Sequence, residues 1–87
     1  MRVLIEIPDE EQFRVWLSEE RKISERRVID VCSRLRRCSK LLQQPVSKMD
    51  HTTFDLLKNN STFKNFGYSI KSQLRGALRL YLTFIGQ

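Results

Sequence analysis

Apolar residues recur along this chain at the three- and four-residue spacing of an α-helix, most regularly between Ser24 and Pro45. Side chains at this spacing fall on one face of a helix. Ser24 suits the N-cap position, and Pro45 cannot continue a helix. We therefore predict a helix over about 25–42, with an inward face formed by Val28, Val31, Cys32, Leu35, Cys38 and Leu42.

The same spacing predicts two helices on either side of this one. A helix over about 10–21 would begin at Asp9 as its N-cap, with Gln12 placed as in a capping box. A shorter helix over about 50–58 would begin with Asp50 as its cap and end at the polar residues that follow. The inward faces consist of Phe13, Trp16 and Leu17 in the first and Phe54 and Leu57 in the second.

A fourth helix is expected over about 70–85, with Ser69 as its N-cap. Lys71, Arg75 and Arg79 are spaced by four residues and form a basic stripe beside its apolar face. The inward face consists of Ile70, Leu74, Ala77, Leu78, Tyr81, Leu82 and Ile85.

Residues 61–68 form a predicted loop that contains Phe63, Phe66 and Tyr68. These rings could pin the loop to the core or stack on nucleic-acid bases. We favour pinning, because aromatic residues in a small protein mostly supply core area.

The fold class follows from these elements. Three glycines and two prolines in 87 residues favour helices over a hairpin-rich β protein. Val3, Ile5 and Ile7 alternate as in a strand, but a lone strand has no partner in so helical a chain. We therefore expect an all-α fold, a compact four-helix bundle over 9–87 preceded by a short extended arm at 1–8.

The length and composition limit the class of protein. A chain of 87 residues forms one domain. No apolar run approaches the ~20 residues of a membrane span, and the first residues lack the long apolar region of a signal peptide. We therefore expect a cytoplasmic protein that has no membrane partner.

The two cysteines, Cys32 and Cys38, are six residues apart on one predicted helix. They would lie ~9 Å apart along its axis, which is too far for a disulfide within an intact helix. His51 is the only histidine, so the further ligands of a metal site are missing. We expect two buried thiols, no metal and no cofactor.

No group of residues indicates catalysis. A nucleophilic site would have to combine His51 with Asp50, which is better explained as a helix cap. The sequence has no phosphate-binding glycine motif and no CxxC pair. We expect that this chain is not an enzyme and binds no small-molecule substrate.

The charges are sorted along the chain. Residues 21–40 carry eight Lys or Arg against two acids, and residues 62–87 carry four against none. The first twenty residues carry six acids and two bases, and the whole chain has a net charge of +6. Two basic segments that fold side by side form a patch that a polyanion would recognise, and nucleic acid is the commonest one.

The candidate DNA-binding residues lie on the two basic helices. Each helix has a serine at its expected start, where free backbone N–H groups favour a phosphate. The basic side chains that follow would continue along the groove of a duplex. The predicted site consists of Ser24, Arg26, Arg27, Arg34, Arg37, Lys40, Ser69, Lys71, Ser72, Arg75 and Arg79.

The run FRVWLSEERKISERRVIDVCSRLRRCSKLL resembles the opening of the core-binding domain of tyrosine recombinases and phage integrases, and YSIKSQLRGALRLYLTFIG resembles its closing helix. The opening pattern is F-x-x-W/Y-L followed by L-S-x-x-T-x-x-x-Y-x-x-x-L. The chain departs from it at Arg27, where threonine is usual, and at Val31, where an aromatic residue is usual. The matching positions are Phe13, Trp16, Leu17, Ile23, Ser24 and Leu35 in the opening, and Ser69, Ser72, Gly76, Ala77, Leu78, Arg79, Tyr81, Phe84 and Ile85 in the closing helix.

This resemblance implies a SAM-like bundle whose second and fourth helices lie against duplex DNA. The family's catalytic residues belong to a separate C-terminal domain, so Tyr68 and Tyr81 are not expected to be nucleophiles. The chain stops where the family's linker would begin, which suggests an excised domain of a protein for DNA integration and recombination, working with other recombinase protomers. The alternative is a helical protein-interaction module that docks an acidic partner, marked by an exposed apolar patch beside the cations.

Overall fold

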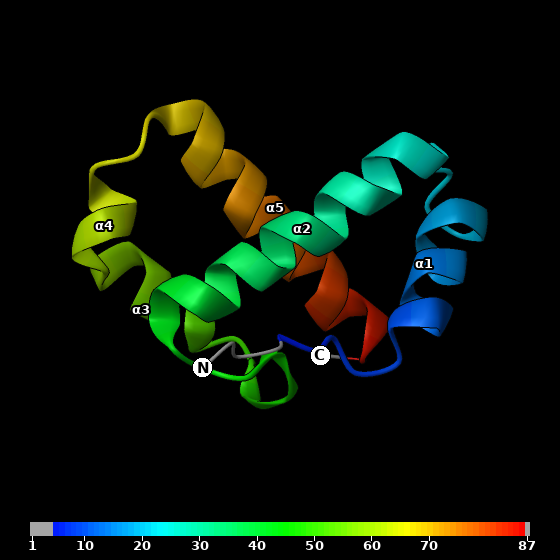
Figure 1. Ribbon diagram of the computed structural model, residues 1–87, viewed down its shortest axis with the longest axis horizontal. Coiled ribbons are helices and arrows are strands. Elements are labelled where there is room, and N and C mark those ends of the chain that lie inside the picture. Colours follow the sequence, from blue (N-terminus) through cyan, green and yellow to red (C-terminus); the bar gives the residue numbers. More distant parts are fainter. Residues whose placement is uncertain (1–4, 87) are drawn as a thin grey trace.

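The structure, a computed structural model, describes residues 5–86, so residues 1–4 of the predicted arm lie outside it. Figure 1 shows α2 and α5 crossing at the centre, with α1 at one end and α3 and α4 at the other. The described part contains no strand, which confirms the all-α prediction, and α4 is a helix that the sequence did not predict. The elements are α1 (Glu10–Glu19), α2 (Glu25–Leu42), the 3-10 turn η1 (Val46–Lys48), α3 (Thr53–Asn59), α4 (Ser61–Lys64) and α5 (Tyr68–Phe84).

Helix α2 begins and ends where the sequence predicts. The Ser24 hydroxyl oxygen accepts a hydrogen bond from the Arg27 backbone N–H at 3.4 Å, which caps the first turn. At the other end, Gln43 adopts the left-handed conformation (φ 51°) that commonly ends a helix. The Ser39 hydroxyl donates to the Gln44 carbonyl at 2.6 Å. Local polar contacts therefore close both ends of this helix.

The apolar face of α2 packs across α5 at the centre of the core. Leu35 of α2 and Leu74 and Leu78 of α5 are at most 1% exposed. The Cys38 thiol donates a hydrogen bond to the Leu74 carbonyl at 3.6 Å. Burial raises the pKa of Cys38 to about 12, so this thiol stays protonated. Cys32 is also buried and free, which confirms the prediction of two buried thiols.

Helix α1 packs against the end of α5 through an aromatic cluster. The fully buried Phe13 ring meets Tyr81 edge-on at 5.4 Å between centroids and lies 5.2 Å from Phe84. The Trp16 ring lies 5.6 Å from Phe84 and is only partly buried. Phe13 therefore anchors α1 in the core, and Trp16 covers the edge of the cluster.

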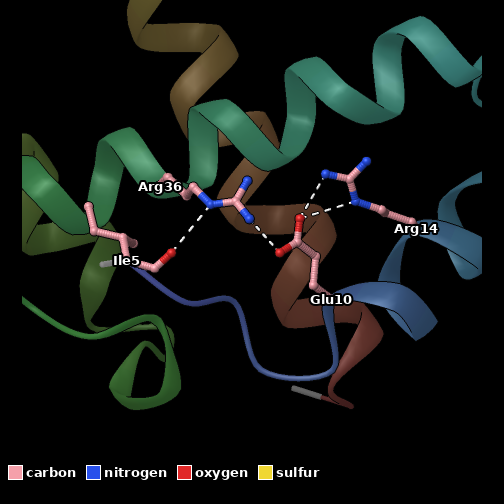
Figure 2. A network of polar contacts seen from close by, with 4 residues as sticks. All are labelled: Ile5, Glu10, Arg14 and Arg36. Carbon is pink, nitrogen blue, oxygen red and sulfur yellow. Dashed lines mark hydrogen bonds and ion pairs between the residues drawn. The ribbon is translucent and has the colours of Figure 1, made fainter. Parts of the chain in front are cut away.

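A polar network joins the N-terminal arm to α1 and α2, as Figure 2 shows. Arg36 donates to the Ile5 carbonyl at 3.4 Å and to the Glu10 carboxylate, which also accepts from Arg14 at 2.8 Å. Burial alone would raise the pKa of the Glu10 carboxyl, but the hydrogen bonds and charges of Arg36 and Arg14 outweigh it and lower the pKa. The ionised carboxylate, together with the buried Ile7, fixes the path of the arm.

Asp9 holds the predicted N-cap position of α1 without a capping hydrogen bond, and Ser69 does not hold the N-cap position of α5. Asp9 adopts a left-handed conformation (φ 53°) and its side chain caps no backbone group of α1, so the capping box with Gln12 does not form. Ser69 lies inside α5, because this helix begins at Tyr68 with Gly67 in the N-cap position. The first turn of α5 therefore has no side-chain cap.

The segment 61–68, predicted as a loop, contains the short helix α4. Asn60 ends α3 and also caps α4, since its Oδ1 accepts from the Phe63 N–H at 2.9 Å. The Asn60 side-chain amide donates to the Leu41 carbonyl of α2 at 3.4 Å. One asparagine thus ends one helix, starts the next and ties both to α2.

Helix α3 begins at Thr53, three residues later than predicted. Asp50 lies in the turn before it, where its carboxylate accepts from the Thr52 N–H at 2.9 Å and its own N–H donates to the Thr53 hydroxyl at 3.0 Å. The hydrogen bond from the Thr52 hydroxyl lowers the pKa of Asp50. The carboxylate has the structural role that the sequence indicated, but it closes a turn instead of capping the helix.

We predict that Leu35→Ala lowers the free energy of unfolding by about 2 to 5 kcal/mol, because it leaves a cavity at the crossing of the two long helices. Leu56→Ala is the matched control, since Leu56 is 48% exposed and should change stability by no more than about 0.5 kcal/mol. Thermal and urea melts measure both. Equal losses in the two variants would contradict the assigned core.

Candidate nucleic-acid interface

Apart from Arg36, the cations of α2 and α5 have no carboxylate partners in the part of the chain that the structure describes. The only ion pairs there join Glu10 to Arg14 and to Arg36, none of which belongs to the predicted site. The predicted site residues with exposed side chains are Ser24, Arg26, Arg27, Arg37, Lys40, Ser69, Ser72 and Arg79, and those partly buried are Arg34, Lys71 and Arg75.

The two helix N-termini do not form one site. In Figure 1 the first turn of α2 and the first turn of α5 lie well apart along the long axis of the molecule, and the helices cross between them. Ser24, Arg26 and Arg27 therefore belong to the end of α2 near α1. Ser69 and Ser72 belong to the opposite end, near α4. A ligand that contacts both groups would have to reach from one end of the molecule to the other, as a stretch of duplex DNA can.

The two basic helices contribute cations to one place, at the junction of α4 and α5. The rings of Phe63 and Phe66, here called the aromatic pair, lie 6.3 Å apart in an edge-on arrangement. Arg37 of α2 lies over Phe66, with 4.7 Å from Cζ to the ring centroid. Lys71 and Arg75 of α5 lie 6.0 and 5.9 Å from the Phe63 centroid. We call Arg37, Lys71 and Arg75 the cation triad.

Each member of the triad lies within the range of a cation–π contact, in which the negative face of a ring attracts a positive charge. The described residues place no acidic group at salt-bridge distance from any of the three. Three like charges therefore lie around one pair of rings, with no described acidic group at salt-bridge distance. Such an arrangement leaves the N–H donors of Arg37 and Arg75 available to an anion.

The three aromatic rings of this segment differ in how deeply they are buried. Phe63 is 3% exposed and Phe66 is partly buried, so the prediction that aromatic residues pin this segment to the core is confirmed for these two. Tyr68 is 79% exposed, and for this residue the prediction is wrong. Because α5 begins at Tyr68, its ring lies on the same helical stripe as Lys71 and Arg75, three and seven residues later. Pinning fails because the ring points away from the core at the first helical position.

The sequence does not reveal that Phe66 supports an arginine of α2. The two residues are 29 positions apart, and no local periodicity connects them. Tyr68, in contrast, has a usable signal, because extending the predicted helix by two residues places it on the basic stripe. The predicted site omits Arg36, but nothing in the sequence indicates that this side chain turns to Glu10 and the arm.

The large exposed apolar side chains are spread over separate elements. Ile29 lies on α2 and Tyr68 on the basic stripe of α5, so each basic helix carries one of them. An interface with a folded protein partner usually has a continuous apolar centre. The exposed large apolar residues are Val15, Ile29, Leu56, Tyr68 and Ile85.

Negative charge gathers on another element. Glu11, Glu19 and Glu20 of the α1 region line a shallow hollow together with Val15 and Trp16. This surface would repel a polyanion. The electrostatic field of the molecule would therefore steer a polyanion away from α1 and toward the two long helices.

The described residues contain no group of three metal-ligating side chains, and none of their helices is long and apolar enough to cross a membrane. The chain matches no protein-family model, no curated protein and no solved structure at a significant level. The assignment of a function therefore depends on the geometry and the charges described above.

We predict that Phe63→Ala lowers the free energy of unfolding by about 3 to 5 kcal/mol, because it removes a buried ring beneath α4 and α5. Tyr68→Ala should change it by no more than about 0.5 kcal/mol, since the ring is mostly in water. Thermal melts of the two variants test the division of this aromatic segment into a buried and an exposed part. A large loss of stability from Tyr68→Ala would show that its ring packs against the protein.

Proposed function

We propose that the chain is a helical DNA-binding domain that holds duplex DNA against α2 and α5 and performs no chemistry of its own. The observation that carries the proposal is the set of cations without carboxylate partners on the described parts of these two helices, in a chain that has ten acidic residues. A protein stabilised mainly by surface ion pairs would place its acidic side chains within ion-pair distance of its cations. Segregated cations instead favour a polyanionic partner.

Duplex DNA fits the arrangement better than a small anion does. The cations extend from the first turn of α2 to the triad at the start of α5, which lie at separate places along the molecule (Figure 1). A repeating row of phosphates offers an acceptor to each group, whereas a single phosphate meets only one.

The resemblance to tyrosine recombinases extends this proposal to a family. The helices α2 and α5 contain most of the residues that resemble the family's two motifs, and they are the long amphipathic helices of an all-α fold. We propose a SAM-like core-binding domain of a recombinase or phage integrase. DNA integration and contacts with other protomers would then require a catalytic domain and belong to the same proposal.

The competing function is a module that docks an acidic protein. The large exposed apolar residues belong to separate elements, with one on each basic helix, which supports an apolar interface centre less well than a run of them on one element would. A partner protein recognised by charge alone would bind weakly, since exposed ion pairs contribute about 0 to 1 kcal/mol each.

We predict that the domain binds a labelled 20-base-pair duplex with a strong dependence on salt. If about four to six phosphates are neutralised, the logarithm of the binding constant falls with the logarithm of the salt concentration at a slope of about −4 to −5. Fluorescence anisotropy at several salt concentrations measures the slope. Affinity that stays constant from low to physiological salt would contradict the electrostatic basis of the proposal.

A second prediction separates a defined face from a diffuse positive charge. Reversing Arg37 and Arg75 to Glu should abolish measurable binding to the duplex, because both lie where α2 and α5 come together. Reversing Lys48 and Lys58 to Glu, on η1 and α3, lowers the net charge by the same amount and should weaken binding far less. Arg14 is unsuitable as a control, since its ion pair with Glu10 supports the fold. Equal losses in two folded double variants would mean that no defined face binds DNA.

A further inference from the structure

We propose that the aromatic pair is a built support for the cation triad, and that the triad is the main phosphate-binding site of the domain, with Phe66 as the positioning residue for Arg37. This inference rests on the proposed DNA binding and names the place where the backbone is held. It also assigns a binding role to Phe66, an apolar residue that would not itself touch the DNA.

The contact between Arg37 and Phe66 is the closest cation–π contact in the described residues, at 4.7 Å. No described hydrogen bond or ion pair uses the Arg37 guanidinium. Its N–H donors therefore remain available to a phosphate, which can accept two of them. The ring attracts the charged group and limits its motion without forming a hydrogen bond to it.

The aromatic pair also connects the cations of the two helices. Phe66 holds Arg37 of α2, and Phe63 lies below Lys71 and Arg75 of α5. The two rings are in edge contact with each other, and Phe63 is 3% exposed, so their positions are set by the core. The spacing between the cations of α2 and those of α5 is consequently fixed before any ligand arrives.

A purely structural role does not account for the triad. Phe63 is 3% exposed with Lys71 and Arg75 beside its ring, and neutral or apolar side chains would cover the two rings equally well. Like charges that converge with no acidic residue nearby destabilise the free protein, and a bound phosphate relieves that repulsion. The arrangement therefore has its physical benefit in the complex with an anion.

Pre-organisation of the Arg37 side chain determines how much this residue should add to the DNA affinity. Ordering a long side chain at an interface opposes binding by about 0.5 to 1.5 kcal/mol, and a cation already held over a ring has less freedom to lose. Lys40, exposed on the same helix and without an aromatic neighbour in any described contact, has no such advantage. Arg37 should therefore contribute more to DNA affinity than Lys40, although both carry one charge.

The test is a double-mutant cycle measured by anisotropy with the labelled duplex at fixed salt. Phe66→Leu keeps the charge and the apolar character, and we expect it to weaken binding about two- to fivefold, the range of an exposed cation–π contact. Arg37→Gln should weaken binding at least as much. The double variant should bind like Arg37→Gln alone, because Phe66 acts through Arg37.

Lys40→Gln supplies the matched control cycle. Its loss should be smaller than that of Arg37→Gln, and it should multiply with the loss from Phe66→Leu. Phe66→Tyr keeps the ring and should restore the affinity of the parent protein. Thermal melts establish that each variant is folded. If Phe66→Leu does not fold, the comparison of Arg37→Gln with Lys40→Gln still decides the question, since equal losses overturn the inference.

Besides equal losses from Arg37→Gln and Lys40→Gln, three further results would overturn the inference while leaving DNA binding intact. These are parent-like affinity of folded Phe66→Leu, a loss from Phe66→Leu that multiplies with the loss from Arg37→Gln, or a failure of Phe66→Tyr to restore binding. Absence of salt-dependent binding by the parent protein would instead refute the proposed function itself. The two failures are therefore distinguishable in one set of titrations.

Discussion

Helices α2 and α5 cross at the centre of the molecule, where Leu35 meets a core that includes Leu74 and Leu78, and every other feature of the chain depends on this contact. Both helices are amphipathic, with cations on the faces that the crossing leaves outside. Burying the apolar faces against each other therefore turns the polar faces to solvent. The same contact that stabilises the fold thus produces the cationic surface, and no separate element is needed to present it.

The placement of the acidic residues decides what that surface can do. Glu10 forms ion pairs with both Arg14 and Arg36, and Arg36 also donates to the Ile5 carbonyl of the arm (Figure 2), so these two cations serve the fold. Acidic residues of the α1 region lie around the hollow beside Trp16. The remaining cations of the long helices have no counter-charge in the described residues. The described charges therefore include the Glu10 network, the acidic surface of α1 and the cations of the two long helices.

The sequence predicts the long helices well and the short elements poorly, for physical reasons. The bounds of α2 follow from a strict apolar period, a serine cap and a proline, and all three act locally. Asp9 fails as a cap because its backbone adopts a left-handed conformation, which its side-chain type does not determine. The sequence does not reveal helix α4, because Asn60 both ends α3 and caps α4. A polar stretch indicates the end of one helix more readily than the start of the next.

The sequence likewise predicts one part of the candidate site and misses the other. Lys71 and Arg75 follow from the four-residue spacing of α5, so their common stripe is visible in the sequence. The convergence of Arg37 with them is not, because it depends on where the α4 segment places Phe66. Periodicity describes one element at a time, and a site assembled from two helices and a connecting segment requires the tertiary structure.

The α4 segment therefore has an importance out of proportion to its length. A helix of four residues does not hold its shape alone, since forming a first turn is unfavourable. It is held by the Asn60 side chain, which caps it and also donates to the Leu41 carbonyl of α2, and by the burial of Phe63. The positions of the aromatic pair follow from these contacts. Any loosening of this segment would release Arg37 from its ring, so the proposed affinity of the triad for an anion depends on the local stability of this four-residue helix.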